Sequence, residues 1–111
     1  MTAFECEPSR QPDHMRLSLF GEFDMAGAGH FESALDDLER DRPQRIVLDL
    51  RGLTFLDSTG LRALLGADTR AREAGRRLTI LQGPDAVRRV FEITGLEGRL
   101  ELVDDEGSLA P

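Results

Sequence analysis

A short apolar run near the middle of the chain restricts the fold more than any other feature. Residues 46–50 read Ile-Val-Leu-Asp-Leu, which is nearly continuous in apolar side chains and rich in branched residues. Such a run is typical of a strand that is covered on both faces. We therefore expect a central strand in a layered protein, with other elements packed on both sides of it.

The residues before this run predict a hairpin and a helix. Met15–Gly21 alternates apolar and polar residues, which predicts a half-buried strand. A shorter strand near Phe4–Glu7 would pair with it across the turn-rich segment Pro8–Asp13. Apolar residues then recur with helical spacing over about Gly29–Arg40, which predicts an amphipathic helix.

Predicted helices and strands alternate after the central run. A long helix carries Leu61, Leu64 and Leu65 on its apolar face and stops at the Ala74-Gly75 pair. The elements after it are a strand at Leu78–Leu81, a helix from Asp85 to Gly95 and a strand at Leu100–Val103. This order predicts an α/β fold with an open mixed sheet, in which an N-terminal antiparallel hairpin precedes βαβ units whose helices pack on the sheet.

Length, charge and cysteine content narrow the class of protein. The 111 residues are enough for one domain, with flexible ends expected at about residues 1–3 and 106–111. The net charge is −7 and the bases form no dense cluster, so we expect no direct nucleic-acid partner.

No long apolar run or leader is recognisable, so we expect a cytoplasmic protein without a membrane partner. The single cysteine, Cys6, excludes an internal disulfide, and we interpret it as a small buried apolar residue.

The most informative junction is Asp57-Ser58-Thr59-Gly60, between a predicted strand and the longest predicted helix. Asp, Ser and Thr are common N-cap residues, because their oxygens accept hydrogen bonds from free backbone N–H groups. The adjacent hydroxyl groups of Ser58 and Thr59 exceed the needs of one cap. A phosphate on Ser58 would meet free N–H donors and the positive end of the helix dipole.

The sequence contains no catalytic or nucleotide-binding motif with the residues and spacing that such a site requires. The Asp57–Gly60 run has one residue too many for the Asp-Thr-Gly of aspartic proteases and occurs once, whereas those enzymes need two carboxylates. His14 and His30 accompany no nucleophile elbow, and we expect both at the surface. The segment Gly27-Ala28-Gly29 lacks the rest of any nucleotide-binding fingerprint. We interpret Asp36-Asp37 and Asp104-Asp105-Glu106 as solvated charge. We expect no catalytic residue, no metal site and no cofactor.

The chain resembles the STAS domain family, in particular the bacterial anti-sigma factor antagonists. The resemblance rests on residues 45–61, which include Asp-Ser-Thr-Gly, and on residues 90–96, Val-Phe-Glu-Ile-Thr-Gly-Leu. Residues 21–24, Gly-Glu-Phe-Asp, match a second family motif at the end of the hairpin. With the order of elements, the similarity covers nearly the whole chain.

This resemblance implies a phosphorylation-controlled partner switch. In the family, the serine after the Asp is phosphorylated by a serine kinase of the histidine-kinase-like ATPase fold that is also the anti-sigma factor. That serine is Ser58 here, with Thr59 as a minor acceptor. Asp24 would lie near it and contact the kinase, while Asp57, Thr59 and Gly60 would shape the loop. Unmodified protein would bind the anti-sigma factor, and a metal-dependent serine phosphatase would restore that state.

The same family also includes subunits of other assemblies. STAS domains occur in stressosome scaffolds and in lipid-transport systems, where Ser58 would be only a helix cap. The segment from Asp104 to Pro111 is also shorter than the final helix of many family members. An intact Asp-Ser-Thr-Gly motif favours the phosphorylation switch over these alternatives.

Overall fold

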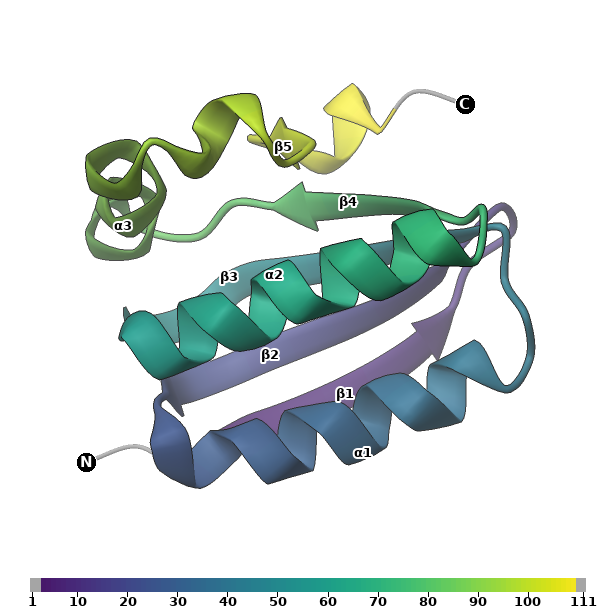
Figure 1. Cartoon of the computed structure of the whole chain (residues 1–111), viewed down its shortest axis with the longest axis horizontal. Helices are drawn as coiled ribbons and strands as arrows, with labels where there is room; N and C mark the ends of the chain where they lie inside the picture. Colours follow the sequence, from purple (N-terminus) through teal and green to yellow (C-terminus); the bar gives the residue numbers. More distant parts are fainter. Residues whose placement is uncertain (1–2, 110–111) are drawn as a thin grey trace.

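One sheet organises the protein, whose computed structural model describes residues 3–109. Its five strands lie in the order β1-β2-β3-β4-β5 (Figure 1). The first two form an antiparallel hairpin, and every later pair is parallel, which confirms the predicted open mixed sheet. The strands are β1 (Glu5–Arg10), β2 (Met15–Phe23), β3 (Arg45–Leu56), β4 (Arg77–Leu81) and β5 (Leu102–Val103).

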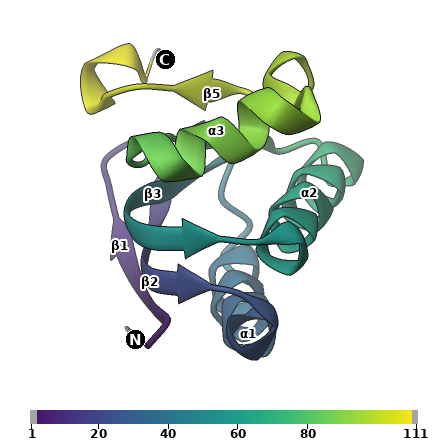
Figure 2. The same cartoon turned by 90° about the vertical axis from the view of Figure 1, so that its left-hand side faces the viewer.

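The helices connect the parallel strands, as the alternating pattern predicts. Helices α1 and α2 cover the same face of the sheet, and α3 packs against β3 (Figures 1 and 2). Gly95 ends α3 with a φ of 73°, a left-handed conformation that favours glycine. The α-helices are α1 (Ala28–Glu39), α2 (Ser58–Glu73) and α3 (Asp85–Thr94), and the 3-10 turns are η1 (Met25–Gly27), η2 (Leu96–Gly98) and η3 (Glu106–Ser108).

The hydrophobic core lies between the sheet and its helices, and α3 contributes Val87 and Phe91 to it. Alternate residues of β2 point into this core, as the apolar and polar pattern of Met15–Gly21 predicts. From α2, Leu61 and Leu64 are buried, and Leu65 is partly buried against the same cluster. The predicted packing of the long helix through these leucines is therefore confirmed.

The N-terminal hairpin differs from its predicted boundaries. Strand β1 extends through Pro8 to Arg10, although the sequence pattern predicts a turn at these residues. Proline is tolerated there because β1 is an edge strand, where a missing N–H leaves no neighbour unpaired. The turn is correspondingly short and is closed by a hydrogen bond from the Gln11 amide to the His14 carbonyl at 2.9 Å. The edge position also leaves Cys6 partly rather than fully buried, and burial raises the pKa of its thiol to about 12.

Two later strands also differ from prediction. Strand β3 continues past Leu50 to Leu56, because its pairing with β2 continues through two register shifts. The last strand is limited to Leu102–Val103. Leu100 is buried, as an apolar residue of a predicted strand should be, but it lies before that strand.

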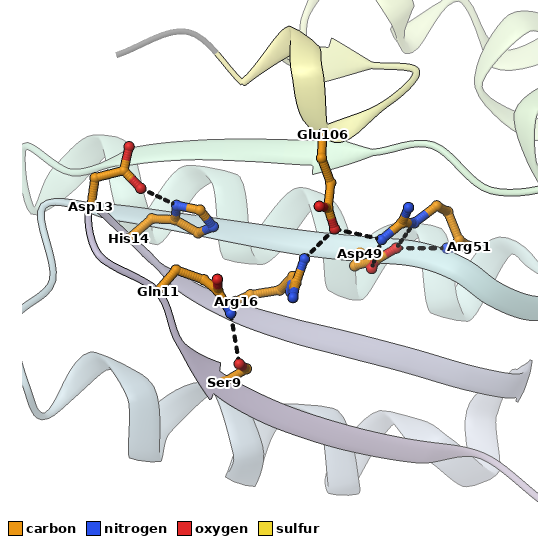
Figure 3. A network of polar contacts seen from close by, with 8 residues as sticks. All are labelled: Ser9, Gln11, Asp13, His14, Arg16, Asp49, Arg51 and Glu106. Atoms are coloured by element: carbon orange, nitrogen blue, oxygen red, sulfur yellow. Dashed lines mark hydrogen bonds and ion pairs between the residues drawn. The ribbon is translucent and has the colours of Figure 1, made fainter.

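The sheet face opposite α1 and α2 carries a polar network (Figure 3). Glu106 in η3 accepts a hydrogen bond from Arg51 at 2.8 Å and also pairs with Arg16. Hydrogen bonds from Arg51 and Arg16 hold the pKa of Glu106 below its usual value. Residues 106–108, expected to be flexible, form η3 in the structure, and the flexibility of residues 106–109 stays a prediction. The expected flexible residues 1–2 and 110–111 lie outside the described residues.

We predict that Leu64→Ala lowers the free energy of unfolding by about 2 to 5 kcal/mol, because it leaves a cavity in a fully buried site. Leu65→Ala is the matched control and should cost clearly less, because Leu65 is only partly buried. Urea denaturation followed by circular dichroism measures both values. Equal losses in the two variants would contradict the packing described for α2.

Candidate functional site

The predicted site residues meet at one edge of the sheet. Strands β2 and β3 are parallel, and their last residues, Phe23 and Leu56, are register partners. Asp24 and Asp57 directly follow these partners, and the Asp57 amide donates a hydrogen bond to the Phe23 carbonyl at 3.3 Å. Figure 2 shows the strand ends beside the start of α2. The structure thus brings Asp24 to the same edge as the Asp57–Gly60 run.

Asp57 is the N-cap of α2. Its backbone is extended, and its Oδ1 accepts hydrogen bonds from the amides of Thr59 at 2.9 Å and Gly60 at 3.0 Å. A carboxylate is well suited to this position because it also meets the positive end of the helix dipole. The sequence alone leaves the cap open among Asp57, Ser58 and Thr59, and the structure assigns it to Asp57.

Ser58 is the first residue of α2 and is exposed to solvent. Its hydroxyl has no hydrogen-bond partner among residues 3–109. Thr59, one residue further into the helix, is partly buried. Ser58 therefore presents the more accessible hydroxyl of the two. The proposal that Ser58 is only a helix cap does not fit this geometry, because the capping bonds come from Asp57.

This geometry also changes one expectation about a phosphate on Ser58. From the sequence, the phosphate is expected to meet free amides at the start of the helix. The amides of Thr59 and Gly60 already donate to the Asp57 carboxylate, and the Leu61 amide donates to the Asp57 carbonyl at 2.9 Å. A phosphate on Ser58 would therefore need partners other than these amides.

Gly60 allows α2 to approach the strand ends closely. A Cβ atom at this position would lie 2.6 Å from the carbonyl oxygen of Phe23 and 2.7 Å from Cδ1 of Leu56. Backbone cannot easily move away from such a contact, so a larger residue would push the helix off the sheet. The absence of a side chain at Gly60 keeps the start of α2, and with it Ser58, beside the end of β2.

Asp24 caps the short turn η1. Its Oδ1 accepts a hydrogen bond from the Ala26 amide at 3.0 Å, and its side chain is partly exposed. It also lines an open hollow of about 320 Å³ together with Phe4 and His30. Asp24 therefore has a local structural role in addition to any contact with a partner.

Two exposed apolar residues, Met25 and Phe55, lie near the ends of β2 and β3, and the sequence pattern did not predict their exposure. Met25 is 76% exposed and directly follows Asp24, while Phe55 is 46% exposed and lies at the end of β3. Ile93, on α3, is 79% exposed. They are the large hydrophobic residues with high exposure in the part of the chain that the structure describes. Such residues could have been found in the sequence as apolar residues that fall outside the periodic, buried face of a helix or strand.

Neither histidine is hydrogen-bonded to Ser58 among residues 3–109. His14 precedes β2, at the end of that strand away from Asp24, and its ring pairs with Asp13 at 2.7 Å. The expectation that His14 is a surface residue is wrong, since its side chain is only 10% exposed on the polar sheet face (Figure 3). His30 is exposed, as expected. Residues 3–109 contain no cluster of His, Cys, Asp and Glu suited to a metal ion, and no helix among them is long and apolar enough to cross a membrane.

Comparison with known proteins places this geometry in a family. Residues 6–104 match the family described as "Mlab, STAS domain". The anti-sigma-B factor antagonist of Listeria monocytogenes is 31% identical over 100 residues, which cover 90% of this chain and 88% of that protein. An anti-sigma factor antagonist from Mycobacterium paratuberculosis has 26% identity and a TM-score of 0.81, over 95% of this chain and 89% of the other.

A third comparison concerns the fold alone. The Bacillus cell fate determinant SpoIIAA, solved in its phosphorylated form, has a TM-score of 0.69 at 22% identity. The match covers 96% of both chains. The arrangement of sheet and helices is therefore shared with a protein whose structure was determined in a phosphorylated state.

We predict that Asp57→Ala lowers the free energy of unfolding by about 1 kcal/mol, because it removes the cap of α2. Ser58→Ala should change it by less than about 0.5 kcal/mol, since an exposed hydroxyl without partners is removed. Chemical denaturation of the two variants beside the parent protein measures the difference. A loss in Ser58→Ala as large as that in Asp57→Ala would mean that Ser58 is part of the cap.

Proposed function

The chain belongs to the STAS domain family, and we propose that it is an anti-sigma factor antagonist controlled by phosphorylation of Ser58. In this proposal, the unmodified protein binds an anti-sigma factor that is also a serine kinase of the histidine-kinase-like ATPase fold. Phosphorylation releases the complex, and a metal-dependent serine phosphatase resets the switch. The protein acts by binding in the cytoplasm and catalyses no reaction itself.

The exposed hydroxyl of Ser58 is the observation that carries this proposal. A kinase needs an accessible hydroxyl, and Ser58 is exposed while Asp57 supplies the capping bonds. Modification of Ser58 therefore removes no hydrogen bond of the fold. Thr59 is the less accessible hydroxyl at this junction and would be a minor acceptor at most.

The surroundings of Ser58 support a binding role for this edge. Met25, which follows the end of β2, and Phe55, near the end of β3, expose apolar surface, and apolar surface near a functional site favours contact with another protein. Asp24 and Asp57 add negative charge at the same edge. A partner surface with apolar groups, a basic group facing Asp24 and an acidic group facing Ser58 would bind this edge until Ser58 is phosphorylated.

Electrostatic repulsion explains how phosphorylation of Ser58 would lower the affinity for one partner and so allow exchange for another. A phosphoserine brings about −1.5 to −2 charges at neutral pH. One pair of like charges about 5 Å apart costs roughly 3 kcal/mol at an effective dielectric constant of 20. If half of that energy survives screening, the affinity falls about tenfold. The fold is less affected because the phosphate lies at the start of a helix, on the solvent side.

We predict that Ser58→Ala binds the anti-sigma factor constitutively and that Ser58→Asp binds it poorly. Both variants should have the melting temperature of the parent protein. Each purified variant serves as bait in an extract of the source cells, and mass spectrometry identifies what it captures. The proposal expects a kinase of the histidine-kinase-like ATPase fold with Ser58→Ala and much less of it with Ser58→Asp.

Two outcomes of this capture would overturn the proposal. Equal recovery of the kinase with both variants would exclude a switch at Ser58. Capture of a multi-subunit scaffold or transport complex in place of the kinase would favour the alternative role within the family.

We also predict that Asp24→Asn folds normally and weakens recognition by the kinase. Asparagine can accept the same hydrogen bond from the Ala26 amide, so the cap of η1 is kept while the charge is removed. A thermal melt and the rate of Ser58 phosphorylation are measured together. A large drop in melting temperature with an unchanged rate would show that Asp24 has a structural role only.

A further inference from the structure

Arg62 lies one helical turn after Ser58 and has no partner of its own. It is exposed, and its side chain makes no ion pair or hydrogen bond within residues 3–109. Residues three and four positions away on the same helix are Ser58, Thr59, Leu65 and Gly66. None of them carries a charge, so α2 offers Arg62 no intrahelical ion pair.

We infer that Arg62 holds the phosphate of phosphorylated Ser58 along the surface of α2. The spacing from residue 58 to residue 62 is i to i+4, which places both side chains on one face of the helix. The acid would precede the base in the chain, which is the more favourable order for such a pair. This inference rests on the proposed phosphorylation of Ser58.

The same helix contains an ion pair with this spacing and order. Asp68 and Arg72, also at i and i+4, form an ion pair at 2.9 Å. The backbone of α2 therefore suits an acid followed four residues later by an arginine. Phosphorylation of Ser58 would create the corresponding pair at the other end of the helix.

The occupied cap limits what the backbone of α2 can offer the phosphate. The amides of Thr59 and Gly60 donate to Asp57, so they are not free to bind a phosphate on Ser58. The nearby carboxylates of Asp57 and Asp24 repel it. Arg62 is the cation that the helix places within reach, and it would act as a positioning residue that stabilises the phosphorylated state of the free protein.

The test uses protein with phosphoserine installed at position 58 by genetic code expansion, so no kinase or partner is required. Phosphorus NMR at low ionic strength gives the second pKa of the phosphate, which is ordinarily about 6. We expect this pKa to be lower by about 0.3, a twofold change in the ionisation constant, with Arg62 present than in Arg62→Gln. Phosphorylation should also raise the melting temperature more with Arg62 present than in Arg62→Gln.

Two further variants separate a specific pair from a general effect of charge. Arg62→Lys should restore most of the difference. Arg89→Gln removes an equal charge from an exposed position on α3 and should leave the pKa of the phosphate unchanged. Equal pKa values with and without Arg62, or an equal change in Arg89→Gln, would overturn the inference. Neither result bears on partner exchange, which fails separately if phosphoserine at position 58 leaves binding of the anti-sigma factor unaltered.

Discussion

The junction between β3 and α2 depends on one carboxylate and one missing side chain. Asp57 binds the amides of Thr59 and Gly60, and this cap defines the first residue of α2. Gly60 lets that end of the helix approach the carbonyl of Phe23, which a Cβ atom would prevent. Together they leave Ser58 exposed beside the end of β2. The hydroxyl of Ser58 is therefore accessible because Asp57 caps the helix. Modifying or removing this hydroxyl disturbs neither the cap nor the core.

The framework of the fold was predictable because its signals are local. The apolar run at residues 46–50 corresponds to the continuously buried first half of β3, and the leucines of the long predicted helix pack as their spacing indicates. Boundaries were less predictable, because sheet position decides them. Pro8 lies inside an edge strand, and β3 continues where its pairing with β2 resumes after a register shift. Local composition does not reveal which strand lies at the edge of the sheet or where the pairing of two strands shifts register.

Contacts between distant residues explain what the sequence could not predict. Glu106 pairs with Arg16 and Arg51 across the open sheet face, although these residues are far apart in the chain. At the site, the motif Asp57–Gly60 predicted a helix start with an available hydroxyl. It did not predict which residue is the cap, nor that the cap occupies the amides a phosphate would otherwise meet. The exposed Met25 and Phe55 were also missed, because apolar residues are expected inside.

The affinity of the unmodified and the Ser58-phosphorylated protein for the anti-sigma factor tests the central claim most directly. The factor recovered with Ser58→Ala is titrated by calorimetry with each form, with phosphoserine installed by genetic code expansion. A phosphate that acts between molecules should weaken binding about tenfold or more. Equal affinity of the two forms would contradict the account, because Ser58 would then carry no signal to the partner.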